Sequence, residues 1–274
     1  MTLSFSLEAT TIWNNCKMSA MIKTIDSKGN ARFKAWKKLK DKQYRHRAQN
    51  LLVEGAVVIE EVMEEGYVEE LIVDKDKRDA YLSFIENVPV EVTLLEHRLF
   101  KELVSTETDQ GLIARCRSFL TDAEKMPKTG RFLYADGVQD PGNLGGMIRS
   151  AEAFCFDGVL IGPGTVDPTN DKCVRASMAS AFRLPIAYVT DEELLHMKTR
   201  CRFVALDIRG KDRIPADDRR NIVLIVGNEA RGIRENLLRE VDLRLRIPMK
   251  ETIDSLNANV AASIAMFVIE GGGQ

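Results

Sequence analysis

The chain has 274 residues, of which 45% are hydrophobic and 29% charged, and its formal net charge is −2. This length buries a sizeable core in one or two domains, and the composition is typical of globular proteins. The charge balance excludes a uniformly basic coat for nucleic acid, and no run approaches the ~18 apolar residues of a membrane span.

The N-terminal segment lacks a basic stretch followed by an apolar one, so the sequence predicts no secretory signal. We assign residues 1–22 to an N-terminal extension without a predicted fold, with Met18 and Met21 as alternative start positions. The five cysteines are scattered without a C-x-x-C pair, and there are three histidines. This pattern predicts no metal site, no disulfide framework and a cytoplasmic location.

Residues 31–47, ARFKAWKKLKDKQYRHR, are predicted to be helical and hold eight Lys or Arg against the single Asp41. Trp36 and Tyr44 are interleaved with these charges. The run fits a solvated helix face, or a patch that binds RNA phosphates and unstacked bases. The candidate RNA-binding residues are Lys37, Lys38, Lys40, Arg45 and Arg47.

The rest of the first half alternates short elements. Residues 50–66 have apolar residues at helical spacing, residues 97–105 resemble a helix, and three segments resemble strands (68–75, 88–95 and 111–119). Together these elements predict a small α/β domain over residues 23–120. The polar segment 121–130, with Pro127 and Gly130, is predicted to be a linker.

The second half repeats strand and helix more regularly. Near-continuous apolar strands are predicted at 131–138, 158–162, 184–189, 203–208, 221–227 and 243–249, and helices at 143–155, 171–182, 191–200 and 257–270. This alternation indicates a parallel sheet covered by helices on both faces, in a domain of residues 131–274. Ligands in such sheets bind at the carboxyl ends of the strands.

Three of these strand ends carry unusual residues: DPGNLGGMIRSA (140–151), VGNEARGI (226–233) and IPMKETIDSLNANVAAS (247–263). The glycine spacing of the first fits neither a Walker loop nor a dinucleotide fingerprint. Each polar residue in these loops also has a purely structural explanation as a helix cap, turn or surface ion-pair partner. Because all three loops are expected at the same edge of one sheet, together they predict a ligand site there.

These segments resemble the three motifs of the SpoU (TrmH) family of RNA ribose 2′-O-methyltransferases, in the family's order. The first half, residues 23–120, resembles the RNA-binding domain, similar to ribosomal proteins, of its rRNA-directed members. The resemblance implies a SPOUT parallel α/β sheet with a C-terminal trefoil knot, S-adenosylmethionine as cofactor, rRNA as partner, and a homodimer. It implies cofactor contacts at Gly227, Ile247 and Leu256, and a catalytic set of Asn143, Arg149, Glu229, Ser255 and Asn257.

The sequence departs from the family at Ala179, where relatives usually carry glycine, and we expect a tolerated helical position there. No histidine lies in the motifs, and a guanidinium stays protonated, so Arg149 is expected to clamp an RNA phosphate rather than to act as a base. Glu229 is expected to orient Arg149 or to accept the proton, while Asn143 and Asn257 hold the ribose. A tRNA-directed enzyme, a base-directed enzyme and a non-catalytic RNA-binding assembly factor are the alternatives.

Overall fold

The computed structural model describes residues 22–106, 108–211, 221–250, 252 and 255–271. Of Lys211 it describes the main chain only. Residues 22–59 and 68–117 form one compact unit, and residues 60–67 and 118–271 form a second. The predicted extension lies outside the described residues except for Ile22, which begins a strand. Among the described residues, no helix is long and apolar enough to cross a membrane.

The first unit is built on a five-stranded mixed sheet with the order β1-β4-β3-β5-β2. Strands β1, β4 and β3 are parallel, whereas β5 pairs antiparallel with β3 and β2. Its elements are β1 (Ile22–Ile25), α1 (Ala31–Lys38), α2 (Lys42–Ala48), β2 (Asn50–Glu54), the start of α3 (Ala56–Glu64), β3 (Val68–Asp74), η2 (Lys75–Tyr81), α4 (Leu82–Ile85), β4 (Glu91–Leu95), α5 (His97–Leu103) and β5 (Leu112–Arg117). From Glu60 on, α3 belongs to the second unit. The small α/β domain is therefore present.

Two local expectations for this unit were wrong. The helix predicted over 31–47 breaks, because Asp41 caps a new helix by accepting from the N–H of Tyr44 at 2.8 Å. Residues 50–54 form β2 rather than helix, since pairing with β5 buries Leu51 and Val53 in alternation. Gly55 then begins a new direction with φ 102° before α3.

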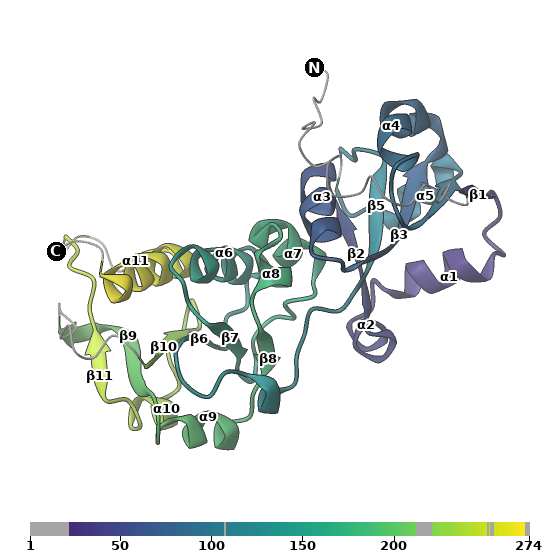
Figure 1. Cartoon of the computed structure of the whole chain (residues 1–274). Coiled ribbons are helices and arrows are strands. Elements are labelled where there is room, and N and C mark those ends of the chain that lie inside the picture. Colours follow the sequence, from purple (N-terminus) through teal and green to yellow (C-terminus); the bar gives the residue numbers. More distant parts are fainter. Residues whose placement is uncertain (1–21, 107, 212–220, 251, 253–254, 272–274) are drawn as a thin grey trace. The chain divides into compact units, whose positions relative to one another are not determined.

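The second unit holds a six-stranded sheet, entirely parallel, with the order β11-β9-β10-β6-β7-β8. Figure 1 shows α6, α7 and α11 over one face of this sheet and α9 and α10 over the other. Its elements are η3 (Ala123–Lys125), β6 (Arg131–Asp136), α6 (Pro141–Ala153), β7 (Gly158–Ile161), α7 (Asp171–Ser177), α8 (Ser180–Arg183), β8 (Ile186–Tyr188), α9 (Asp191–Met197), β9 (Arg202–Lys211), β10 (Ile222–Gly227), α10 (Glu235–Leu238), β11 (Leu243–Leu245) and α11 (Ala258–Glu270). The predicted parallel α/β sheet is confirmed; the knot stays a prediction.

Segment 121–130 is not a free linker, because it packs with the second unit. The N–H of Thr121 donates to the carbonyl of Ile186 at 2.9 Å, and Met126 is buried in the core beside Phe132 and Leu160. The boundary lies between Arg117 and Ser118. Pairing of this segment with the edge strand β8 overrides its polar, proline-containing composition.

The helix predicted over 171–182 is interrupted after α7. Met178 has φ 53° and ψ −139°, and the chain restarts as the short helix α8. Ala179 has φ −83° and ψ −1°, which any residue adopts without strain. Alanine is unstrained there, because the positive φ falls one residue earlier, but the expected helical position was wrong: Ala179 lies in the turn between α7 and α8.

Candidate functional site at the carboxyl edge of the second sheet

The site lies where the chain reverses its direction across the sheet. Strands β6 and β10 are parallel neighbours whose last residues, Asp136 and Gly227, are in register. From β6 the chain proceeds to β7 and β8 on one side, whereas β9 and β11 lie on the other. Such a switch point leaves a crevice outside the carboxyl ends of two adjacent strands. Two of the predicted loops follow these two strands.

The loop after β10 is a closed turn. Asn228 and Gly232 exchange backbone hydrogen bonds of 3.0 and 2.9 Å. The Nδ2 of Asn228 donates to the carbonyl of Gly137 at 2.8 Å and so attaches the turn to the loop after β6. Gly227 has no room for a side chain, since an added Cβ would lie 2.3 Å from the backbone of Gly232 and Ile233. The glycines therefore serve the tight turn.

The glycines of α6 serve helix packing. Asp140 caps α6 by accepting from the N–H of Asn143 at 2.9 Å, and Pro141 occupies the first turn. A Cβ on Gly145 would lie 2.4 Å from the carbonyl oxygen of Cys173 on α7. Gly145 thus lets two helices approach closely, which is a different role from admitting a ligand.

Glu229, Asn143 and Asn257, one from each predicted motif, form a hydrogen-bonded row. The Nδ2 of Asn257 donates to Oδ1 of Asn143 at 2.9 Å, and the Nδ2 of Asn143 donates to Oε1 of Glu229 at 3.0 Å. Asn257 also caps α11, because its Oδ1 accepts from the N–H groups of Asn259 and Val260. The structure therefore brings together three of the five predicted catalytic residues.

Glu229 is an anchored, ionised carboxylate. Its two oxygens accept from the N–H groups of Gln139 at 3.1 Å and Asp140 at 3.2 Å, in addition to Asn143. Burial raises the pKa of Glu229, but these hydrogen bonds outweigh it and hold the pKa below its ordinary value. A carboxylate with a lowered pKa is a weak proton acceptor, which favours the orienting role. The side chain that Glu229 contacts is Asn143 and not Arg149.

We expect Glu229→Gln to lower kcat/KM about a hundredfold, because an amide cannot accept from all three donors and misplaces Asn143. The pH profile of wild-type kcat/KM should show no titration of Glu229 between about pH 6 and 8, because its lowered pKa keeps this carboxylate ionised there. The stabilisation from this carboxylate is present above its unfolded-state pKa and is lost as the pH falls through the lower folded value. If the wild-type pH profile instead showed a titration near neutral pH that disappears in Glu229→Gln, Glu229 would be identified as a proton acceptor.

A cavity of about 810 Å³ adjoins this row. All three residues expected to contact the cofactor line it, Gly227, Ile247 and Leu256. Glu229, Ser255 and Asn257 line the same cavity, whose other walls include the apolar side chains of Leu206, Val226, Met249 and Ala261. Charged and polar side chains, among them Asp207, Arg209 and Glu235, make up much of the remaining wall. The size is typical of small-molecule sites, and the mixed walls suit an adenine ring beside a polar tail.

Arg149 and Ser255 are not part of the hydrogen-bonded row. Arg149 is exposed on α6 and does not line the cavity. It lies six residues beyond Asn143, about 9 Å along the helix and about 240° around it, so the two side chains point in different directions. Arg149 forms no ion pair with the described part of the chain, which leaves it open to a ligand phosphate.

Arg234 and Asp136 are site residues that the sequence did not reveal. The Asp136 carboxylate, 0% exposed, accepts from the backbone N–H of Arg234 at 2.8 Å and from its Nε at 2.6 Å. The guanidinium also donates to both oxygens of Asp191, at 2.7 and 2.8 Å, and to the Tyr134 hydroxyl. Hydrogen bonds to Asp191 and Asp136 raise the pKa of Arg234. We name this cluster the Arg234 clamp; it fixes the far end of the turn that carries Glu229.

The predicted RNA-binding residues of the first unit separate into different environments. Lys38 and Arg47 are exposed, Lys37 pairs with Glu102 at 2.6 Å, and the Nζ of Lys40 donates to a backbone carbonyl. Arg45 is a correction: it is 8% exposed, and its guanidinium donates to the carbonyls of Leu39 and Lys40. It joins α1 to α2 and is removed from the candidate RNA contacts.

One group of potential metal ligands occurs among the described residues, formed by Asp74, Asp76 and His97. The buried Asp74 carboxylate accepts from the N–H of Asp76 at 3.1 Å and lies 2.8 Å from Nδ1 of His97. These bonds account for the cluster as a cap between β3, η2 and α5, without a metal.

Comparison with known proteins assigns both halves of the chain. Residues 130–267 match the model of the SpoU rRNA Methylase family, and residues 30–114 match an MRM3-like substrate binding domain. The chain is 34% identical over 258 residues to the 23S rRNA (guanosine(2553)-2′-O)-methyltransferase RlmP of Bacillus subtilis. This match covers 91% of the chain and 100% of the relative.

Solved structures agree over nearly the whole chain. The AdoMet-bound rRNA methyltransferase of Sinorhizobium meliloti is 25% identical with a TM-score of 0.78, covering 90% of this chain and 97% of that one. The SpoU methyltransferase AviRb of Streptomyces viridochromogenes, in complex with AdoMet, is 26% identical with a TM-score of 0.78, covering 89% and 99%. Both neighbours combine this fold with the same bound cofactor.

Proposed function

Because the chain belongs to the SpoU rRNA Methylase family, we propose that it transfers the methyl group of S-adenosylmethionine to a ribose 2′-hydroxyl of ribosomal RNA. The observation that carries the proposal is the row of Asn257, Asn143 and Glu229, whose two end residues line the same cavity as Gly227, Ile247 and Leu256. In this arrangement, a row of polar side chains suited to bind a ribose lies next to a cavity suited to bind the cofactor. When bound there, S-adenosylmethionine supplies an electrophilic methyl group.

The residues of this chain then act mainly by positioning, since methyl transfer needs an aligned nucleophile and suitably placed charge. Glu229 fixes the amide of Asn143, and Asn143 with Asn257 presents amide groups to the target ribose. Ser255, exposed on the cavity wall, offers a hydroxyl to the same substrate. Arg149 binds an RNA phosphate and stabilises negative charge that develops on the attacking oxygen.

The substrate is proposed to be rRNA because the first unit matches a substrate binding domain and the relative RlmP is named for 23S rRNA. This proposal implies a cytoplasmic location. The test uses radiolabelled S-adenosylmethionine and rRNA lacking its native modification, followed by alkaline hydrolysis. Label in alkali-resistant dinucleotides is expected, because a 2′-O-methyl group blocks cleavage at its own phosphodiester. Label in mononucleotides would indicate base methylation, and cofactor binding without label would favour a tRNA substrate or a non-catalytic factor.

The homodimer is supported by an apolar stripe on α11. Val260, Ile264 and Phe267 lie at helical spacing and are 45%, 36% and 46% exposed. A stripe of this kind on a helix of a globular protein is normally covered, and a second copy of the chain is the proposed cover.

We expect Ile264→Glu to convert the dimer to a monomer, because a charge buried in an apolar interface carries a large desolvation cost. Sedimentation equilibrium measures the change. Leu195→Glu on α9 is the matched control, since Leu195 is 39% exposed and its substitution should leave the mass unchanged. A wild-type mass equal to one chain would contradict the proposal.

A further inference from the structure

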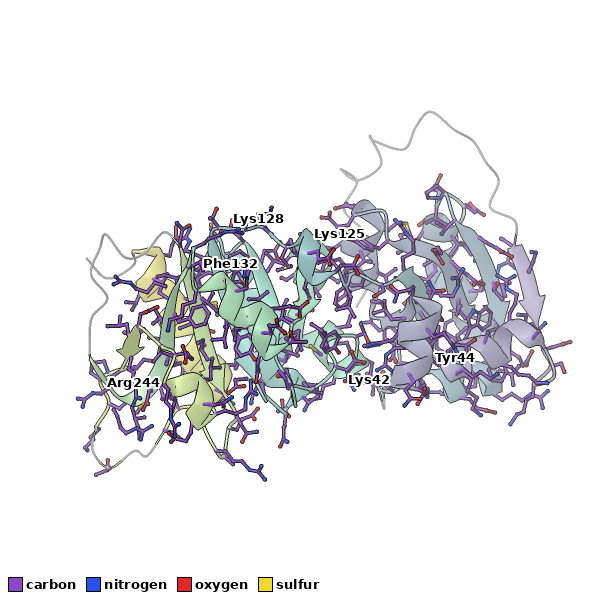
Figure 2. All side chains as sticks on the ribbon, turned by 90° about the horizontal axis from the view of Figure 1, so that it is seen from below. Lys42, Tyr44, Lys125, Lys128, Phe132 and Arg244 are labelled. Carbon is purple, nitrogen blue, oxygen red and sulfur yellow. The ribbon has the colours of Figure 1, made fainter. Side chains whose placement is uncertain are left out.

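The basic run of the first unit contains a half-buried aromatic ring with two cations near it. Tyr44 lies on α2, with the Nζ of Lys38 5.7 Å from its ring centroid and the guanidinium carbon of Arg47 5.4 Å from it. Figure 2 labels Tyr44 and the neighbouring Lys42 on this part of the chain. Trp36, the other aromatic residue of the run, is 2% exposed and therefore closed to a ligand.

The structure separates the cations of this run into two kinds. Arg32 pairs with Glu70 and Glu91, and Lys37 pairs with Glu102, so these cations are neutralised within the fold. Lys38 and Arg47 are exposed and have no ion pair among the described residues; both lie near the Tyr44 ring instead. Two unneutralised cations beside one ring repel each other unless an anion joins them.

We propose that Tyr44, Lys38 and Arg47 bind one unpaired nucleotide of the RNA substrate, with its base stacked on the Tyr44 ring and its phosphates held by the two cations. The inference rests on the proposed function, because it names the form of RNA that the first unit takes. Stacking on an aromatic ring requires a base outside a helix, whereas duplex RNA is bound through phosphates and 2′-hydroxyls. The ring therefore favours a single-stranded loop or bulge over a duplex.

The binding test uses the full chain with a single-stranded oligoribonucleotide of about 12 nucleotides and an RNA duplex of about 16 base pairs. Fluorescence anisotropy over a range of salt concentrations gives both affinities. Tyr44→Leu is expected to weaken single-strand binding about tenfold without changing the salt slope, whereas Tyr44→Phe keeps wild-type affinity. Lys38→Gln should lower the slope by about 0.7 for the single strand, as expected for one lost phosphate contact.

A second readout reports stacking directly. A 2-aminopurine in the oligoribonucleotide should be quenched by the wild type and by Tyr44→Phe, but not by Tyr44→Leu. Tyr44→Met, with an unbranched side chain and no ring, replaces Tyr44→Leu if thermal melting shows that the latter is unfolded.

Three outcomes would overturn the inference. Tyr44→Leu could weaken binding of the single strand and of the duplex equally, or weaken neither. Alternatively, a poly-glutamate peptide could bind the wild type as tightly as the single strand does, with an affinity that Tyr44→Leu leaves unchanged. The last would indicate an acidic protein partner. These failures are distinct from failure of the proposed function, in which the wild type would not methylate rRNA at all.

Discussion

Replacing Arg149 by alanine is expected to lower the rate of RNA methyl transfer by about a hundredfold to a thousandfold while leaving S-adenosylmethionine affinity unchanged. The side chain is exposed on α6, forms no ion pair with the described residues, and does not line the cavity. Its loss therefore leaves the fold and the cofactor walls intact, and removes only a charge that RNA would meet. Single-turnover kinetics with rRNA and calorimetry with the cofactor measure the two quantities separately.

Arg149→Lys distinguishes a planar guanidinium from a simple positive charge. A phosphate clamp uses two parallel N–H donors, so we expect the lysine variant to retain only a small part of the activity. Arg200→Ala is the control, because Arg200 is also exposed in the second unit but lies away from the three motifs. Full activity of Arg149→Lys would show that the bidentate geometry is unnecessary and that the clamp is wrong.

Breaking the Arg234 clamp should have the largest effect on stability. Arg234→Met leaves the fully buried carboxylate of Asp136 without its charged partner, and we expect a loss of about 3 kcal/mol in the free energy of unfolding. This is the lower end of the usual range, because the Arg234 side chain is 34% exposed and water can reach the carboxylate. Urea denaturation without cofactor measures this loss.

The same variant should also raise the KM for S-adenosylmethionine, since Arg234 holds the end of the turn that carries Gly227 and Glu229. Arg234→Lys should recover part of the stability through the charge alone. The double variant Arg234→Met with Asp136→Leu should be more stable than Arg234→Met, because it leaves no unpaired buried carboxylate. Unchanged stability in Arg234→Met would mean that the clamp contributes nothing to the fold.

The architecture of the second half and the position of its site could be predicted from the amino-acid pattern alone. Apolar strands alternating with helices specify a parallel sheet covered on both faces, and the carboxyl ends of its strands lie at one edge. The loops after β6, β10 and β11 therefore had to converge, and Glu229, Asn143 and Asn257 do meet there. The motif resemblance added the family, and with it the cofactor, which no spacing rule would have supplied.

Which side chains are partners became known only from the folded chain. Glu229 contacts Asn143 rather than Arg149 because six helical residues turn Arg149 away from the row. Arg45, inside a run of exposed cations, is buried because it joins two helices through backbone carbonyls.

The same holds for long-range pairings. Asp136 and Arg234 are 98 residues apart, and β2 is a strand because β5 lies beside it. A local pattern records the periodicity of one element, whereas these contacts depend on where distant elements come to lie, and that is why the sequence alone left them undetermined.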